Sequence, residues 1–322
     1  MPPFDYHRAT SIDDAVAALA RPGSVPLSGG TDLMPQMRDA VASPAGVVDL
    51  RRIPGAGDVT WGDDGGCTIG GAARLADLAR DPRMRASFPL LAESCAAVGS
   101  NALRHMGTLG GNLCQRPRCE YFRHGFSCHK NGGDSCPAAT GENERHAIFG
   151  GGPCVAVHPS DPAVALTALE AVVHVAGAGG VRDVAIDRFF VLPAHRLDLE
   201  TVLAAGEFVS GVSLPARSAG GVQRYEKVMA RAAWDFALVS LAALRRSDGE
   251  VRLVLGGVAP VPWRVTESIE EDVASGGLSD DDIETLAQRA MYDAVPLAKN
   301  GYKVEMAAAL LRRAIRELVA GA

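Results

Sequence analysis

The sequence predicts an α+β fold in two domains, and three observations lead to this prediction. Apolar residues make up 47% of the 322 residues, enough for two cores of ordinary domain size. Helical and strand patterns mix up to about residue 214, and the small, polar stretch Arg217–Gly221 is then typical of a linker. Beyond it, three strand-like runs precede two helical runs. We therefore predict domains at 1–216 and 217–322.

The N-terminal part predicts a small α/β unit built around a glycine turn. Ser11 and Asp14 fit a capping box before a helix at 12–20. A strand at 24–27 runs into Ser28-Gly29-Gly30-Thr31-Asp32, and one or two helical turns at 33–38 lead to a strand at 46–50. Asp32 is expected to cap the turn rather than to contact a phosphate, because like charges repel.

The rest of the chain predicts further mixed elements. Asp161 stands where a helix N-cap belongs and Pro162 where the first helical residue belongs. In the first domain we expect strands at 67–69, 172–175 and 208–214, and helices at 75–80, 90–98 and 163–171. In the second domain we expect antiparallel strands at 223–230, 237–245 and 251–258, and helices at 280–291 and 303–319.

Charge and hydropathy exclude several classes of protein. The formal charge of −6, with both signs scattered, provides no basic stripe for a nucleic acid backbone. No eighteen apolar residues follow one another, and the N-terminus lacks the basic and apolar regions of a signal peptide. We therefore expect neither a membrane span nor a secretion signal.

Cysteines are concentrated in one segment. Five of the seven lie between Cys114 and Cys154, with four, eight, seven and seventeen residues between successive members and no C-x-x-C pair. This is poor zinc-finger spacing, and the odd total argues against a disulfide framework. A four-thiolate metal site remains, and a basic docking loop with buried cysteines is the alternative. The segment's basic residues would offset anionic thiolates and sulfides; they are Arg116, Arg118, Arg123, His124, His129, Lys130 and Arg145.

Two glycine loops offer backbone for an anionic ligand. Ser28-Gly29-Gly30-Thr31 and Gly107-Thr108-Leu109-Gly110-Gly111-Asn112 place paired glycines where bare N–H groups can approach a pyrophosphate. Neither is a GxGxxG fingerprint, so a Rossmann site is not supported. One Gly-Gly pair is more often a tight turn, but two such loops favour a dinucleotide.

These loops also carry a family resemblance that covers essentially the whole chain. The run Pro26–Leu33, followed by Thr108–Leu113, resembles the FAD-binding middle subunits of the xanthine dehydrogenase and carbon monoxide dehydrogenase family of molybdenum hydroxylases. Further similarities are His158-Pro159-Ser160-Asp161, the strand from Gly206 to Pro215, and Tyr225-Glu226-Lys227 with Arg231 and Asp235-Phe236-Ala237.

The resemblance implies the fold and the FAD ligands. It implies an FAD-binding domain of the vanillyl-alcohol-oxidase type with lobes at about 1–55 and 56–216, then a C-terminal domain like that of carbon monoxide dehydrogenase flavoproteins. Ser160 and Asp161 would bind the adenosine side or its ribose, and Lys227 would lie near the isoalloxazine. The pyrophosphate would be held by Leu27, Ser28, Gly29, Gly30, Thr31, Asp32, Leu33, Thr108, Gly110, Gly111 and Asn112.

The cysteine segment resembles an insertion found in only some of these subunits. About 40 residues, roughly 114–155, separate the second glycine loop from the Ser160-Asp161 pair. This insertion is similar to the one that holds a [4Fe–4S] cluster in the flavin subunits of 4-hydroxybenzoyl-CoA reductase and of a bacterial aldehyde oxidoreductase. The resemblance implies the ligands Cys119, Cys128, Cys136 and Cys154, with Cys114 as a spare thiol. The gaps between cysteines depart from those of the reductase, so we favour an oxidising complex and keep a reductase-type subunit as an alternative.

The function that the resemblance implies is electron transfer. A large molybdenum-cofactor subunit would oxidise an aldehyde or N-heterocycle, and a small [2Fe–2S] subunit would pass electrons to FAD and on to ferredoxin, quinone or dioxygen. The molybdenum cofactor and the [2Fe–2S] clusters belong to those partners, and we expect no catalytic residue in this chain, because its eight histidines form no acid–base constellation. A stand-alone FAD oxidase and a scaffold without flavin are alternatives. We expect a cytoplasmic location, or a periplasmic one by export with a partner carrying a twin-arginine signal.

Overall fold

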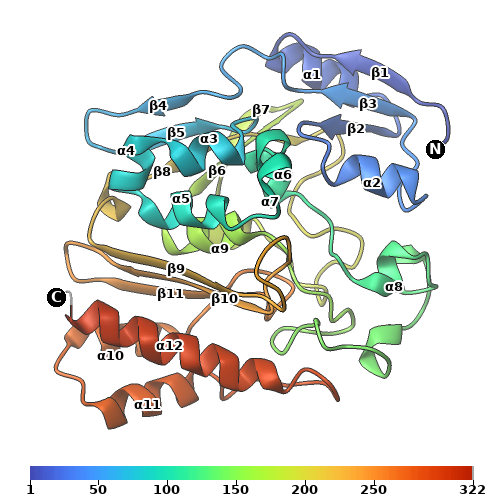
Figure 1. The fold of residues 1–322 in the computed structure, drawn as a ribbon. Helices are drawn as coiled ribbons and strands as arrows, with labels where there is room; N and C mark the ends of the chain where they lie inside the picture. Colours follow the sequence, from blue (N-terminus) through green and yellow to red (C-terminus); the bar gives the residue numbers. More distant parts are fainter. Residues whose placement is uncertain (321–322) are drawn as a thin grey trace.

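Three β-sheets organise residues 1–320, the part of the chain that the computed structural model describes (Figure 1). One sheet has three strands, one has five and one has four. Helices lie against each of them, so the predicted α+β class is confirmed. No helix in this range is long and apolar enough to span a membrane.

The N-terminal sheet is parallel, with strand order β1-β3-β2. The side chain of Ser11 accepts the N–H of Asp14 at 3.0 Å, but the Asp14 carboxylate accepts the N–H of Thr10 at 2.8 Å instead of that of Ser11. The predicted capping box is therefore only half formed. The elements are β1 (Asp5–Arg8), α1 (Ile12–Leu19), β2 (Ser24–Leu27), α2 (Leu33–Arg38) and β3 (Gly46–Asp49).

The five-stranded sheet is antiparallel, with order β4-β5-β8-β6-β7. Its strands are β4 (Val59–Trp61), β5 (Cys67–Gly70), β6 (Val172–Gly177), β7 (Gly180–Ala185) and β8 (Phe208–Leu214). The helices that contribute to the same apolar core, or border it, are α3 (Leu75–Arg80), α4 (Pro82–Ser87), α5 (Pro89–Ala96), α6 (Asn101–Met106), α7 (Leu109–Leu113) and α9 (Asp161–Ala168). The predicted glycine-rich stretch is thus helical in its second half.

Helix α9 begins one residue earlier than predicted. Ser160, with φ −86° and ψ 114°, is its N-cap, and the Ser160 hydroxyl accepts the N–H of Ala163 at 3.0 Å. The predicted N-cap role of Asp161 is therefore wrong. The reason is tertiary, because the Asp161 carboxylate turns to Tyr225 and Lys227 in the following domain.

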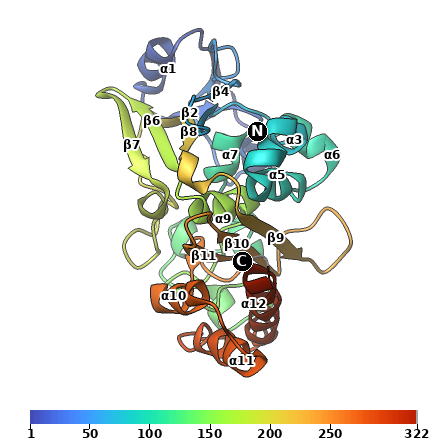
Figure 2. The ribbon, with the colours of Figure 1, turned by 90° about the vertical axis from the view of Figure 1, so that its left-hand side faces the viewer.

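The C-terminal sheet has order β12-β11-β10-β9 and lies between two helical layers (Figure 2). Along β10, Leu241 and Ala243 pack with the C-terminal helices, whereas Ala242 and Leu244 pack with the core of the first domain. Both faces are buried, which explains the nearly continuous apolar run of this strand. The elements are β9 (Val222–Val228), β10 (Val239–Arg245), β11 (Val251–Gly256), β12 (Trp263–Arg264), α10 (Glu267–Ser275), α11 (Asp280–Arg289) and α12 (Tyr302–Ala320).

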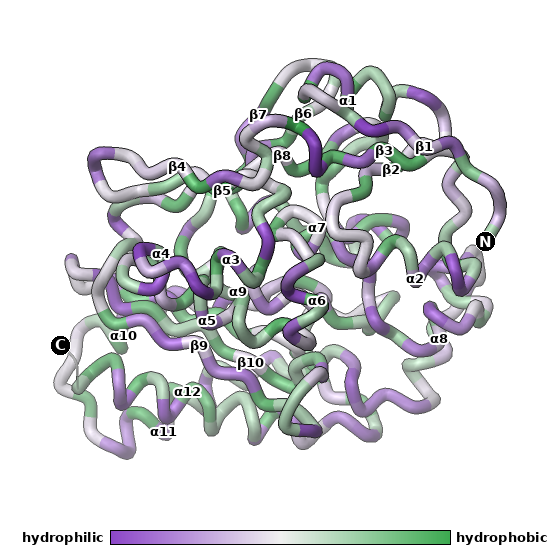
Figure 3. The backbone as a smooth tube through the Cα atoms, turned by 45° about the horizontal axis from the view of Figure 1, so that its top comes forward, coloured by the Kyte–Doolittle hydropathy of each residue, from purple (hydrophilic) through white to green (hydrophobic). Residues whose placement is uncertain are grey.

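The cysteine segment, residues 114–155, lies at one side of the molecule beside α2 (Figure 1). It contains the short helix α8 (Glu120–Arg123) and two 3-10 turns, His129–Asn131 and Pro137–Ala139. Much of the chain around α8 is hydrophilic (Figure 3). Near its end, Ile148 and Phe149 enter the C-terminal core, and both N–H groups donate to the carbonyl of Val258. The segment is therefore fixed to the second domain.

Several elements, most of them short, lie outside the predictions. β7, for example, is exposed at five of its six positions and forms by pairing with β6 through the turn at Gly177–Gly180. The other helices and strands that were not predicted are β1, β4, β12, α4, α6, α7, α8 and α10.

Candidate functional site

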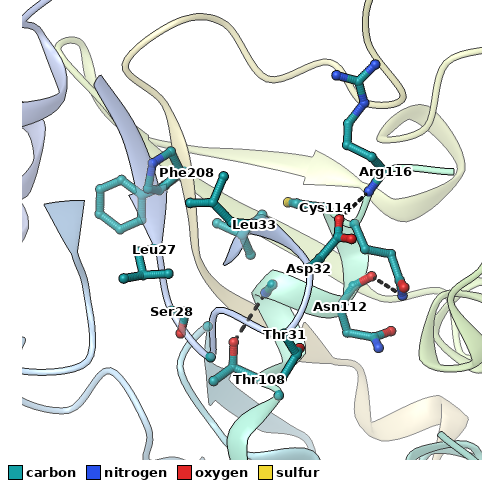
Figure 4. Close-up of a pocket in the computed structure, with 18 of the residues that line it drawn as sticks. Leu27, Ser28, Thr31, Asp32, Leu33, Thr108, Asn112, Cys114, Arg116 and Phe208 are labelled. Atoms are coloured by element: carbon teal, nitrogen blue, oxygen red, sulfur yellow. Dashed lines mark hydrogen bonds between the residues drawn. The ribbon is translucent and has the colours of Figure 1, made fainter. Parts of the chain in front are cut away.

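A cavity of about 1260 Å³ opens between the N-terminal unit, α7 and the segments that follow β7 and β9. It is larger than the roughly 300–1,000 Å³ of pockets that take drug-sized ligands. Both glycine loops line it (Figure 4). We call it the large cavity.

The first glycine loop, Leu27–Leu33, presents unpaired backbone to the large cavity. Within residues 1–320, the N–H groups from Ser28 to Asp32 donate no hydrogen bond to another backbone group, and the buried Ser28 hydroxyl has no partner. A Cβ on Gly29 would lie 2.0 Å from the carbonyl oxygen of Met106, and Gly30 has a φ of +71°. Glycine is therefore needed at both positions, and the result is a row of N–H groups suited to an anion.

The second glycine loop, Thr108–Asn112, uses its N–H groups differently. The N–H of Leu109 donates to the carbonyl oxygen of Ala73, and the N–H of Gly110 donates to that of Gly71, both at 2.9 Å. Thr108 is the N-cap of α7 and its hydroxyl accepts the N–H of Gly111 at 3.4 Å (Figure 4). This loop shapes the cavity by close packing instead of by free N–H groups.

Asp161 and Lys227 form an ion pair in the cavity wall. The Asp161 carboxylate accepts from the Lys227 ammonium at 2.8 Å and from the Tyr225 hydroxyl at 2.7 Å. Burial raises the pKa of Asp161, while Lys227 and Tyr225 act in the opposite direction. The hydroxyl of Ser160 donates to Asn112 Oδ1 at 2.5 Å, and Ser160 itself is not among the residues that line the cavity.

Asp32 departs from its predicted role as a cap of the turn. It occupies the N-cap position of α2, but its carboxylate makes no capping hydrogen bond. Instead it accepts the N–H of Arg116 at 2.8 Å and the guanidinium of Arg123 at 2.8 Å (Figure 4 shows the Arg116 bond). This carboxylate thus links the first glycine loop to the cysteine segment.

Comparison with known protein families agrees with this architecture. Residues 2–217 match the FAD binding domain in molybdopterin dehydrogenase, and residues 224–318 match the CO dehydrogenase flavoprotein C-terminal domain. The chain belongs to the family of FAD-binding medium subunits of molybdenum hydroxylases.

Several relatives of this FAD-binding medium subunit are similar over nearly their whole length. The aldehyde oxidoreductase FAD-binding subunit of Escherichia coli is 35% identical over 327 aligned positions, which cover 98% of each chain. The carbon monoxide dehydrogenase medium chain of Hydrogenophaga pseudoflava is 27% identical, over 98% of this chain and 96% of that one. A solved structure of carbon monoxide dehydrogenase from the same organism superposes with a TM-score of 0.76 at 25% identity, over 99% of this chain and 98% of that one. These relatives are flavoprotein subunits of oxidoreductases, and this chain is one as well.

In this medium subunit the seven cysteines lie in three places. Cys67 and Cys95 are in the apolar core, and Cys114 lines the large cavity. Cys119, Cys128, Cys136 and Cys154 line one small pocket of about 10 Å³, roughly the space of one water molecule. We call it the cysteine pocket. The described residues contain no group of three or more His, Cys, Asp or Glu side chains arranged to hold a metal ion.

The cysteine pocket also contains His146, which the sequence did not single out as a site residue. Its Nε2 lies 3.3 Å from Sγ of Cys119, and burial lowers the pKa of His146 to about 4. Its carbonyl accepts from the buried Lys303 ammonium at 2.9 Å. Burial also raises the pKa of Cys119 to about 11. The position of His146 between Cys136 and Cys154 was the one available signal.

The basic residues of the cysteine segment mostly face carboxylates instead of thiols. Arg118 and Arg123 pair with Asp32, Lys130 and Arg116 pair with Glu200, and Arg145 pairs with Asp235. Lys130 and His129 also line the cysteine pocket, where the charge of Lys130 favours the thiolate of Cys154 against the effect of burial. Glu200 was not predicted as a site residue, because nothing in its local sequence distinguishes it.

Proposed function

We propose that this medium subunit binds FAD in the large cavity and transfers electrons within a molybdenum hydroxylase complex that oxidises an aldehyde or an N-heterocycle. The row of unpaired N–H groups at Ser28–Asp32 carries this proposal, because a pyrophosphate is the dinucleotide group that accepts from such a row. The size of the cavity supports it.

The proposed FAD ligands are those that the sequence indicated. Residues Leu27–Leu33 would hold the pyrophosphate through backbone N–H groups, with Thr108, Gly110, Gly111 and Asn112 forming the facing wall. Asp161 would reach the ribose side, since each carboxylate oxygen has a lone pair left beyond its bond to Tyr225 or Lys227. Lys227, held by Asp161 and by the carbonyl of Ala97 at 3.0 Å, would stand beside the isoalloxazine, and Ser160 would act through Asn112.

The chain's own residues would bind, orient and shield the cofactor. FAD, when bound, would supply the capacity to take up electrons in pairs and release them singly or in pairs. A large molybdenum-cofactor subunit and a small [2Fe–2S] subunit would act before it, and ferredoxin, quinone or dioxygen would act after it. The resemblance to an aldehyde oxidoreductase subunit over 98% of both chains supports an aldehyde as substrate.

We also propose a [4Fe–4S] cluster at the cysteine pocket, with Cys119, Cys128, Cys136 and Cys154 as ligands. The donor set supports it, because four thiols and, within residues 1–320, no carboxylate line this pocket. The pocket has only about 10 Å³, so the thiols would have to move apart to admit the cluster. His146 would then be a positioning residue at Cys119, as metal-site ligands commonly receive a hydrogen bond from a neighbour. The seven cysteines are free, which favours a reducing compartment, so we place the complex in the cytoplasm, with export beside a twin-arginine partner as the alternative.

The domain division is part of the same proposal. We place the boundary between residues 216 and 217, within a 3-10 turn at Ala216–Ser218 that joins β8 to β9. The FAD domain would then span 1–216, with lobes at about 1–55 and 56–216 and the insertion at about 114–155, and the C-terminal domain would span 217–322.

Two measurements on purified protein test this function. The full chain should carry one FAD and iron, seen as flavin absorbance with a broad iron–sulfur shoulder. It should not oxidise an aldehyde or a purine with an artificial dye until the two partner subunits are added. Turnover by the chain alone, without molybdenum, would support a stand-alone oxidase, and absence of both chromophores would support a scaffold.

A further inference from the structure

Three of the carboxylates in the wall of the large cavity, each on a different segment, face the cysteine segment. Asp32 belongs to the first glycine loop, Glu200 to the chain before β8, and Asp235 to the chain between β9 and β10. Their side chains are between 6% and 13% exposed. Buried carboxylates around a site for a dianionic pyrophosphate are unfavourable unless cations neutralise them.

Every ion-pair partner of these carboxylates within residues 1–320 comes from the cysteine segment. Arg123 and Arg118 each place a guanidinium nitrogen against Asp32 Oδ1, at 2.8 Å and 3.0 Å. Arg123 is fixed by further bonds to the carbonyls of Arg116 and Pro117, at 2.9 Å and 2.8 Å. This geometry orients the first glycine loop as well as neutralising it.

The other two carboxylates, Glu200 and Asp235, are also paired with cations of the cysteine segment. Glu200 accepts the Lys130 ammonium at 2.6 Å and faces Nε of Arg116 at 2.7 Å. Asp235 and Arg145 form a bidentate pair at 2.7 Å and 3.1 Å. The cysteine segment is thus connected to the cavity wall at three separate places.

The charges do not cancel, and the surplus is positive. Five cations (Arg116, Arg118, Arg123, Lys130 and Arg145) face these three carboxylates, which leaves two positive charges on the segment. The other carboxylates of the wall do not offset this surplus, because Asp161, Asp198 and Glu207 are each paired with another cation, Lys227, Arg196 and Arg182 respectively. Arg116 and Arg118 line the cavity themselves. Burial lowers the pKa of Arg118, Asp32 opposes this, and the like charge of Arg123 adds to it. Arg118 therefore stands where a further anion is favourable.

We propose that the cysteine segment supplies the cationic wall of the FAD cavity, with Arg118 and Arg116 facing the FAD pyrophosphate and Arg123 positioning the first glycine loop through Asp32. This inference rests on the proposed function, since it assumes that the cavity takes FAD. It assigns to the segment a role in flavin binding in addition to any role in holding a cluster. The ligand class is a dinucleotide with two phosphate charges, matched by the two surplus cations.

The test is an FAD titration of the full chain as purified, after removal of bound flavin. Arg118→Gln and Arg123→Gln should each weaken FAD binding about tenfold or more, because each removes a cation from a poorly hydrated wall. Arg289→Gln is the matched control, since Arg289 forms a half-exposed pair with Asp272 on the C-terminal helices. That control should bind FAD as the wild type does.

A double variant distinguishes the loss of charge neutralisation from general disruption of the structure. In Asp32→Asn with Arg123→Gln, the carboxylate that needs neutralising is gone, while the amide oxygen can still accept the N–H of Arg116. FAD affinity should return to within a few-fold of wild type. An affinity no better than that of Arg123→Gln alone, or wild-type affinity in Arg118→Gln and Arg123→Gln, overturns this inference. Failure of the wild type itself to bind FAD overturns the proposed function first.

Discussion

Oδ2 of Asp161 lies 2.8 Å from Nζ of Lys227, and both side chains are about 95% buried in the wall of the large cavity. The two residues are 66 positions apart and belong to different domains of the chain. Their contact couples the start of α9 to strand β9 of the C-terminal sheet, so it affects both stability and the proposed flavin site.

Removal of one member of this pair should lower the free energy of unfolding much more than removal of both. Lys227→Met leaves the Asp161 carboxylate buried and unpaired, which we expect to lower the free energy of unfolding by about 3–5 kcal/mol. In the double variant with Asp161→Asn, most of that loss should be absent, because no charge is then stranded. Urea unfolding of the two single variants and the double variant measures this, and simple additivity of the losses would contradict it.

His158 should make the folded state sensitive to acid. It is 5% exposed, its Nε2 lies 3.3 Å from the carbonyl of Leu113, and burial lowers its pKa from 6.5 to about 4. The unfolded chain therefore binds the proton first, so stability is complete above about pH 6.5 and falls as pH drops towards 4. The loss approaches about 3 kcal/mol. His158→Gln should flatten the dependence of unfolding free energy on pH in this window, and an unchanged slope would count against a buried neutral imidazole.

Gly29→Ala should abolish flavin binding while iron remains. The new Cβ would lie 2.0 Å from the carbonyl oxygen of Met106, so the first glycine loop must shift away from its N–H geometry. Gly301→Ala is the control, because a Cβ there meets no atom of residues 1–320 within 4 Å. FAD and iron per chain are measured for both variants. Full FAD occupancy in Gly29→Ala would show that this loop is not part of the FAD site.

Gly110→Val should also lose FAD, by overpacking. Its Cβ would lie 2.9 Å from the carbonyl oxygen of Gly71, whereas no strained φ is involved at Gly110 or Gly111. Among the described residues, a Cβ at Gly111 meets only the Thr108 hydroxyl, at 3.0 Å. We therefore expect Gly111→Ala to bind FAD more tightly than Gly110→Val in a direct titration. Tighter FAD binding by Gly110→Val than by Gly111→Ala would show that the exposed backbone of Gly111 matters more for binding than the packing of Gly110.

The four cysteines of the cysteine pocket should differ from the other three in iron content. Replacing Cys119, Cys128, Cys136 or Cys154 by Ser should lower iron by up to about four atoms per chain, since a hydroxyl is a poor ligand for iron. Cys67→Ser, Cys95→Ser and Cys114→Ser should retain iron, because these thiols lie outside the pocket. Iron and zinc are determined on proteins purified without oxygen. Iron lost in Cys114→Ser and retained in Cys119→Ser would refute the assignment, and zinc in place of iron would refute the cluster.

The sequence predicted features that depend on neighbouring residues. Paired glycines at Gly29-Gly30 and Gly110-Gly111 indicated places where the backbone approaches other atoms closely, because only glycine lacks a Cβ. Most long helices and strands followed from apolar periodicity, and the resemblance separated four cysteines from three in the same way that the fold places them.

Only the tertiary structure decided which polar groups meet. The sequence predicted Asp161 as the helix cap, but Ser160 takes that role because Tyr225 and Lys227 lie close enough to engage Asp161. Asp32 contacts Arg123 across 91 positions of sequence. Local spacing sets backbone conformation through sterics and periodic burial, but ion pairs and free N–H groups depend on which distant segments the packed cores bring together. This chain's own sequence therefore determined most of its longer elements and its glycine turns, and the three-dimensional packing determined the charges around its cavity.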